Sequence, residues 1–225
     1  MAEKRGEKQK FFREMIYFPI VYNVEGLVAV SVLYAFSPEH FVDSETLNAV
    51  LYLGVVATHW FLFYILVRRL GKNYMKELIV PKKKFRFLPS ILVFLSLNVI
   101  FTGYMVLALT YGRIPPFGHV TSLQFIFYIL INPLTAGFVE ELIWRGYFIE
   151  NLLRAGKAEW KAIIYSSTSF AFIHGFIIVD KLIVTFLFGV IAGAYYLRER
   201  NIPVLMATHM IVDVIAFSMT IFKPF

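Results

Sequence analysis

Long apolar runs separated by short polar stretches dominate this chain of 225 residues. A helix that crosses the ~30 Å hydrocarbon core of a bilayer needs about 20 consecutive apolar residues. Runs of about this length recur from one end of the chain to the other. The predicted spans are approximately residues 15–36, 46–67, 88–111, 122–150, 160–178, 181–197 and 202–222. The pattern therefore predicts an all-α fold, a polytopic transmembrane helical bundle of about seven spans within a range of six to eight.

The fourth run is the longest and contains Asn132-Pro133, where the missing proline N–H predicts a kink. Composition agrees with a membrane protein, because 59% of the residues are hydrophobic whereas soluble domains average about 45–50%. The chain has no cysteine, which excludes disulfides, thiolate catalysis and cysteine-ligated metals. No small-residue cleavage site follows the first apolar run, so we interpret it as a retained span.

Basic residues predict the orientation of the bundle, because cytoplasmic loops are enriched in lysine and arginine. On the side opposite the basic N-terminal tail and the basic loop 68–86, the only basic residues are Arg113, Lys181 and Lys223. The N-terminus is therefore predicted to be cytoplasmic and the C-terminus outside. This distribution also accounts for the net charge of +7 without a nucleic-acid partner. The segment "PKKKFRF" (residues 81–87) is expected to lie against anionic lipid headgroups.

Several polar side chains fall inside the predicted spans, where a charge is costly and ordinarily serves a function. They are Glu25, His59, Asn98, Glu140, Glu141, Arg145, His174, His209 and Asp213. A lone intramembrane histidine usually bonds to a neighbouring helix, and we expect this of His59, for which spacing indicates no intramembrane partner. The sequence assigns no role to Glu25.

The stretch "FVEELIWRGYFIE" (residues 138–150) contains two adjacent glutamates that differ in their predicted partners. Residues four apart share a helix face, so Glu141 is predicted to pair with Arg145. Glu140 shares its face with Trp144 and has no local partner. Glu141 and Arg145 are therefore predicted to be structural and Glu140 reactive, the alternative being that all three form a packing network.

Two later spans contribute further titratable groups. His174 follows Phe170 by one turn, and His209 and Asp213 are again four residues apart. At a rise of about 1.5 Å per residue, these groups and Glu140 lie at overlapping depths in the bilayer. We therefore predict one shared site.

The motifs Glu140-Glu141-x-x-x-Arg145, Phe170-x-x-x-His174 and His209-x-x-x-Asp213 resemble those of the CAAX protease and bacteriocin-processing family. Its members are intramembrane endopeptidases that include the type II CAAX prenyl proteases, also called the Abi family. The resemblance covers about residues 122–218, and the run with Phe186, Gly189 and Gly193 is similar to the glycine-bearing helix of the family. Many members have Asn at the position of Asp213.

The resemblance implies hydrolysis of a peptide bond in a membrane-associated peptide or protein. Glu140 and His174 would activate the water, and His209 with Asp213 would stabilise the oxyanion or, with Asp213 ionised, orient His209. Residues 122–225 would form the catalytic core, and residues 1–121 the N-terminal helices of the same membrane domain. The sequence has no His-Glu-x-x-His motif, which favours catalysis without a cofactor, and the small size of the chain favours a multi-pass protein of a prokaryotic plasma membrane.

Three alternatives use the same residues differently. The set Glu140, His174, His209 and Asp213 contains good Zn²⁺ ligands, so a zinc-dependent intramembrane metalloprotease is one. A proton-coupled carrier is a second, because chains of acidic residues and histidines also relay protons, although no internal repeat is found. A non-enzymatic immunity or scaffold protein is the third. The substrate class stays open between a prenylated C-terminal peptide, a bacteriocin leader and a sorting tag.

Overall fold

The structure is a computed structural model, and it describes residues 12–25, 27–28, 31, 44–114, 117, 120–174 and 178–222. All regular secondary structure in these residues is helical. Residues 12–25 form the first helix. The others are α2 (Ser44–Leu70), α3 (Lys72–Ile79), α4 (Phe87–Thr110), α5 (Ser122–Ile126), the π-helix η1 (Phe127–Ile131), α6 (Asn132–Glu140), the π-helix η2 (Glu141–Ile149), α7 (Glu150–Arg154), α8 (Glu159–Phe172), α9 (Val179–Glu199) and α10 (Ile202–Phe222).

Among the described residues, five helical stretches are long and apolar enough to cross a membrane. They are Val50–Leu70, Phe87–Thr110, Ser122–Arg154, Val179–Glu199 and Ile202–Phe222. The predicted all-helical, multi-pass architecture is thus confirmed. Two of the seven predicted spans are not among the five: the run 15–36 extends beyond the described residues, and the run 160–178 contains α8, which has 14 residues. That length is below the ~20 residues that a span needs.

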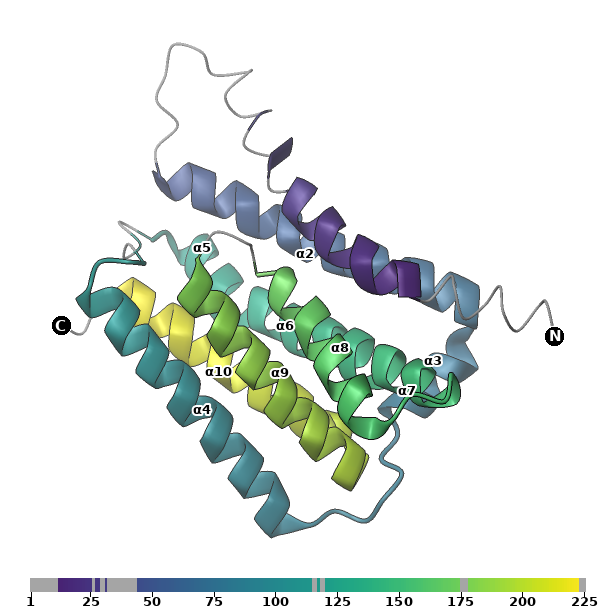
Figure 1. Cartoon of the computed structure of the whole chain (residues 1–225). Helices are drawn as coiled ribbons and strands as arrows, with labels where there is room; N and C mark the ends of the chain where they lie inside the picture. The colour runs from purple at the N-terminus through teal and green to yellow at the C-terminus, as the bar shows by residue number, and fades with distance from the viewer. Residues whose placement is uncertain are drawn as a thin grey trace.

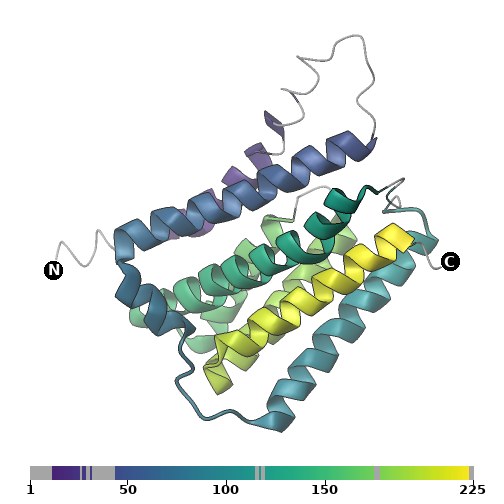
Figure 2. The same ribbon diagram turned by 180° about the vertical axis from the view of Figure 1, so that it is seen from behind.

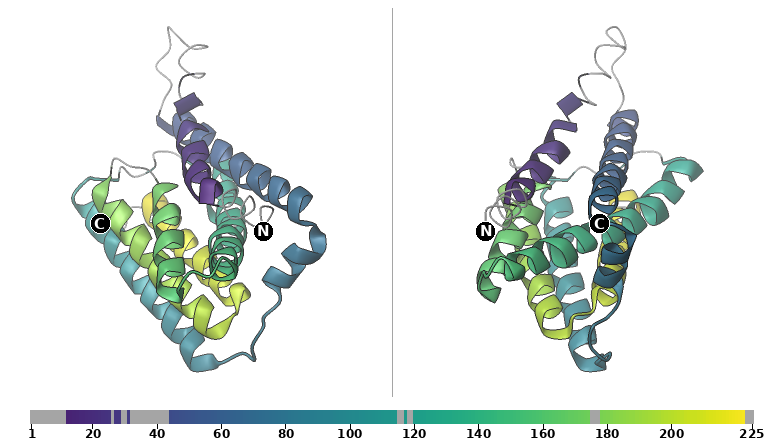
Figure 3. Two further views of the ribbon diagram at one scale, coloured as in Figure 1. Left: turned by 45° about the vertical axis from the view of Figure 1, so that its right-hand side comes forward. Right: turned by 90° about the vertical axis from the view of Figure 1, so that its right-hand side faces the viewer.

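The helices form a bundle whose most deeply buried element is η2, in which every residue is buried. Figure 1 shows α9 between α4 and α8, with α10 behind it. In the view from behind, α10 lies between α4 and the long helical stretch that contains α6 (Figure 2). The helix at residues 12–25 and α2 lie together on one side of this bundle (Figure 3). Two bonds to this first helix fasten it: Ser169 donates to the carbonyl of Met15 at 2.7 Å, and Asn23 donates to the carbonyl of Phe172 at 2.8 Å.

Two glycines allow the close helix contacts that shape the interior. A Cβ atom at Gly189 would lie 2.8 Å from Cβ of Ser167, so α9 and α8 meet without an intervening side chain. A Cβ atom at Gly137 would lie 2.9 Å from the carbonyl oxygen of Met206. The contact at Gly137 holds α6 against α10, and so brings the glutamates at the end of α6 towards the histidine of α10.

The predicted kink at Asn132-Pro133 takes the form of a π-helical stretch, η1, that ends at Ile131. Pro133 has no N–H to donate to the carbonyl of Ile129, and the helix widens over that turn. A second π-helix, η2, begins at Glu141 and includes Arg145. π-helical turns inside α-helices are frequent at functional sites.

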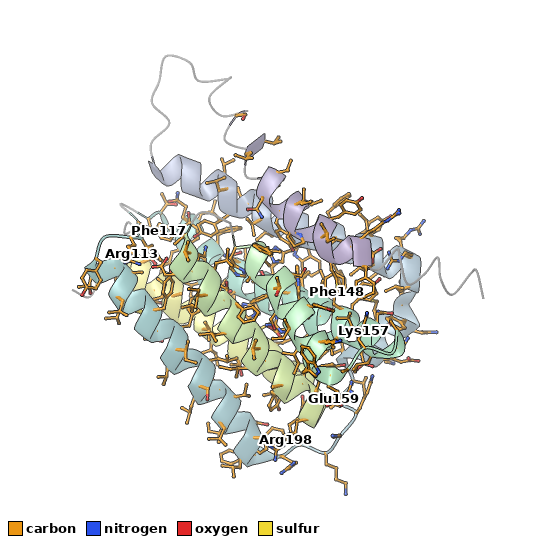
Figure 4. The ribbon with its side chains drawn as sticks, in the orientation of Figure 1. Arg113, Phe117, Phe148, Lys157, Glu159 and Arg198 are labelled. Atoms are coloured by element: carbon orange, nitrogen blue, oxygen red, sulfur yellow. The ribbon has the colours of Figure 1, made fainter. Side chains whose placement is uncertain are left out.

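The basic segments meet at one end of the bundle. The backbone N–H of Lys82 donates to the carbonyl of Arg200 at 3.0 Å, and Arg86 pairs with Glu199 at 3.2 Å. Arg200 also pairs with Glu150 of α7. Figure 4 shows Arg198 at this end and Arg113 at the opposite end.

The segment "PKKKFRF" is fastened to the protein through several of its cations. Besides the pair of Arg86 with Glu199, Lys82 pairs with Glu150 at 3.4 Å, and Lys83 donates to the carbonyl of Arg198 at 2.5 Å. Its contact with lipid headgroups stays a prediction.

Candidate active site

A cavity of about 250 Å³ lies inside the bundle, and each of the three motifs contributes at least one titratable side chain to its wall. Glu140 from α6, His174 from the end of α8, and His209 and Asp213 from α10 all line it. The four residues that the sequence analysis placed in one site are thus brought together. The cavity wall also includes His59 and Lys181, two residues that the sequence analysis did not assign to the site.

His209 is the central group, with three carboxylates around its ring. Its Nδ1 lies 2.8 Å from Oε1 of Glu141, and its Nε2 lies 3.7 Å from Oε2 of Glu140 and 3.8 Å from Oδ1 of Asp213. Because a carboxylate accepts, Nδ1–H donates to Glu141, and Nε2 is left facing the other two acids. His209 and Glu140 are both 4% exposed, so these charges interact with little screening by water.

The predicted pair of Glu141 with Arg145 is present, with 3.2 Å between Oε1 and Nη1. Both side chains are buried, at 0% and 1% exposure. The guanidinium also lies 4.1 Å from the ring centroid of Phe170, a cation–π contact. Glu141 therefore does more than the sequence analysis expected: besides neutralising Arg145, it orients the ring of His209.

His174 is held in one tautomer. Its Nδ1 lies 3.0 Å from the carbonyl oxygen of Phe170, and a carbonyl can only accept. Nδ1 therefore carries the hydrogen, and Nε2 is the nitrogen that can take a proton. The ring also contacts Phe170 edge-on at 4.9 Å between centroids, so Phe170 fixes both its position and its tautomer.

The structure supplies a partner that spacing within one helix could not name. His59 was expected to bond to a neighbouring helix, and its Nε2 lies 2.7 Å from Oε1 of Glu140, which has no partner within its own helix turn. The bond joins α2 to α6 across 81 residues of sequence, and His59 is 1% exposed. No spacing rule within one helix could have indicated it. The available signal was a buried histidine in an otherwise apolar span.

The helix at residues 12–25 covers this part of the cavity. Tyr22 contacts the ring of His59 edge-on at 4.9 Å between centroids. Glu25 packs on α2 at Gly54, where a Cβ atom would collide with its carboxylate, and its two oxygens are buried with no hydrogen-bond partner among the described residues. Asn98 lies outside the cavity wall and donates to the carbonyl of Phe94 in its own helix.

The cavity contains acidic residues and histidines, the residue types that bind zinc. A zinc ion at a catalytic site takes three protein ligands at about 2.0–2.2 Å. Within the described part of the chain, no group of three or more His, Asp or Glu is arranged to hold a metal ion. One oxygen of Glu140 and Nδ1 of His209 are already bonded to other side chains. Among the described residues, the arrangement therefore does not fit a zinc site.

Comparison with known proteins gave one match. Residues 122–215 match the family model described as "type II CAAX prenyl endopeptidase Rce1-like". No curated protein and no solved structure matched. The matched segment contains Glu140, His174, His209 and Asp213 but not His59. Over residues 122–215 the chain is therefore similar to the Rce1-like type II CAAX prenyl endopeptidases, which is the resemblance that its three motifs predicted.

Proposed function

We propose that this protein is an intramembrane endopeptidase that hydrolyses a peptide bond of a membrane-associated substrate by direct attack of water. The observation that carries the proposal is the convergence of Glu140, His174, His209 and Asp213 on one buried cavity. Ionisable side chains inside a membrane are costly and ordinarily mark a functional site. The family match over the same residues supports a protease rather than a carrier or a scaffold.

Activation of the water is assigned to Glu140 and His174. Oε2 of Glu140 has no hydrogen-bond partner among the described residues, whereas Oε1 is bonded to His59. His174 has Nε2 available as an acceptor because Nδ1 bonds to the backbone. A water held between these two acceptors would lose a proton as it attacks the carbonyl carbon, which is general-base catalysis.

Stabilisation of the oxyanion is assigned to His209, with Asp213 beside it. Because Nδ1–H donates to Glu141, His209 can offer a donor at Nε2 only as the doubly protonated imidazolium. Three carboxylates within 3.8 Å are placed to neutralise that cation, those of Glu141, Glu140 and Asp213. A fixed N–H at the developing oxyanion is typically worth about 10²–10³ in kcat. As the tetrahedral intermediate collapses and the C–N bond breaks, the proton that Glu140 took from the water passes to the leaving amine, which restores the carboxylate and leaves His209 an imidazolium.

The placement in the membrane is part of the proposal. We propose seven spans, counting the apolar run 160–178 as a short span although its helix α8 has 14 residues. The N-terminus and the loop around Lys82 are cytoplasmic in this proposal, and the membrane is a prokaryotic plasma membrane. The bonds between this loop and the turn at Arg200 support a common side for these basic segments. The positive-inside rule then makes that side cytoplasmic.

The experiment uses the full-length protein in lipid nanodiscs and a fluorogenic farnesylated peptide ending in a C-a-a-X sequence, beside its unprenylated twin. We expect the wild type to cleave the farnesylated peptide and His174→Gln to lose most of that activity, with mass spectrometry defining the bond. A second assay compares newly formed protein termini in membranes of cells that express either form. Absence of cleavage in both assays, or equal cleavage by His174→Gln, would contradict the proposal.

A further inference from the structure

The bond between His59 and Glu140 gives the two carboxylate oxygens of Glu140 different surroundings. Oε1 lies 2.7 Å from Nε2 of His59, whereas Oε2 has no hydrogen-bond partner among the described residues and lies 3.7 Å from Nε2 of His209. The terminal torsion of a glutamate side chain ordinarily has a broad, roughly two-fold distribution. A hydrogen bond to one oxygen fixes this torsion and so fixes the direction of the other oxygen. Oε2 is then the oxygen turned towards the cavity and its histidines.

His59 is itself held on the side away from Glu140. Its Nδ1 lies 2.7 Å from the carbonyl oxygen of Val55, one turn earlier in α2, and must carry a hydrogen because the carbonyl only accepts. Nε2 and Oε1 consequently have one proton between them, whichever of the two atoms carries it. Either arrangement commits Oε1 to the histidine, and where Oε1 carries the proton it passes to Nε2 of His59 as Oε2 takes the proton of the water. Tyr22 covers the ring edge-on, and the imidazole is 1% exposed, so water does not compete for the bond.

From this geometry we propose that His59 is a positioning residue for peptide hydrolysis, and that it holds Oε1 of Glu140 so that Oε2 receives the proton of the attacking water. The inference rests on the proposed function. It also means that the site is completed from outside the family-matched segment, because α2 supplies a group that residues 122–215 lack. Misplacement of a catalytic group by about 1 Å can cost about 10²-fold in rate, so loss of this bond should act on kcat.

A neighbouring contact between the same helices provides the matched control. Trp60 donates from Nε1 to Oγ1 of Thr135, 3.2 Å away, so α2 and α6 are also joined by a bond that does not involve Glu140. Thr135→Val removes the acceptor and keeps the side-chain shape. A merely structural role for His59 predicts that His59→Leu and Thr135→Val behave alike.

The test measures kcat and KM of the full-length protein in nanodiscs with the farnesylated C-a-a-X peptide. We expect His59→Leu to lower kcat about 100-fold with KM within about threefold of the wild type. Thr135→Val should keep kcat within about twofold. His59→Gln should recover to within about tenfold of the wild type, because its amide N–H reaches about as far as Nε2 and can donate to Oε1. Equal kcat for His59→Leu and Thr135→Val would overturn the inference and leave the proposed function standing.

A spectroscopic measurement reads the contact independently of turnover. The ¹⁵N resonances of the His59 ring, assigned by their disappearance in His59→Gln, should shift in Glu140→Gln and stay in place in Thr135→Val. Unshifted resonances in Glu140→Gln would overturn the inference even if every variant were active. If the wild type hydrolysed no peptide but Glu140→Gln still shifted the His59 resonances, the proposed function and the role of His59 in the rate would both be rejected. The bond between His59 and Glu140 would still be supported.

Discussion

Replacement of Glu141 by Gln removes the charge that neutralises Arg145 inside the bundle. The two side chains are 0% and 1% exposed, and 3.2 Å separates Oε1 from Nη1. At an effective dielectric constant of about 20, two unit charges at this distance attract by about 5 kcal/mol. Breaking a buried pair by removing one partner typically costs about 3–5 kcal/mol. Gln keeps the shape and can still accept from Nδ1–H of His209, so the lost charge dominates. We expect Glu141→Gln to lose about 3–5 kcal/mol of unfolding free energy.

The assay is reversible unfolding in mixed micelles, followed by circular dichroism. Glu77→Gln on the exposed face of α3 is the matched control and should stay within about 0.5 kcal/mol of the wild type. The double variant Glu141→Gln with Arg145→Met removes both charges, and should lose less than the sum of the single variants by at least about 1 kcal/mol. A Glu141→Gln protein within 1 kcal/mol of the wild type would refute the reasoning.

Three further predictions test other parts of the account. Asp213→Asn should remain active, because Asn has the same shape and supplies a hydrogen-bond donor, and exhaustive chelation should leave hydrolysis intact. Activity that is lost on chelation and restored by stoichiometric Zn²⁺ would instead make the acids and histidines metal ligands. Reporter fusions at Lys76 and Phe225 should give opposite sidedness, and the same sidedness would reject the seven-span arrangement. Gly189→Leu should destabilise the protein by about 1–3 kcal/mol through overpacking on Ser167, whereas Gly103→Leu, with open space around it, should not; equal stability of the two would contradict the close contact of α8 and α9.

Contacts within one helix could be predicted from the sequence. The pair of Glu141 with Arg145 follows from a spacing of four residues, and the shared face of His209 and Asp213 follows in the same way. The long apolar runs likewise predicted α4, α9 and α10 to within a few residues. These features depend on helix periodicity and length alone, which the order of the residues contains directly.

Contacts between helices could not be predicted in this way, because they depend on how the helices pack. The bond from His59 to Glu140 spans 81 residues of sequence, and the bond from His209 to Glu141 spans 68. Glu140, for which the spacing within its own helix indicated no partner, is bonded to His59 of α2.

The length of α8 was overestimated for a different reason. The apolar run continues to residue 178, but the helix ends at Phe172, where i→i−3 bonds from Ile173 and His174 tighten the last turn. Hydropathy does not register where a helix ends inside an apolar run.

The central claim is that Glu140 activates the attacking water, and single-turnover hydrolysis by Glu140→Gln tests it most directly. The measurement uses the full-length protein in nanodiscs with the farnesylated peptide, beside thermal melting of the same samples. We expect a folded variant whose rate of bond cleavage falls by about 10²–10⁴, as for removal of a general base. A folded Glu140→Gln protein that cleaves the peptide at the wild-type rate would contradict the account.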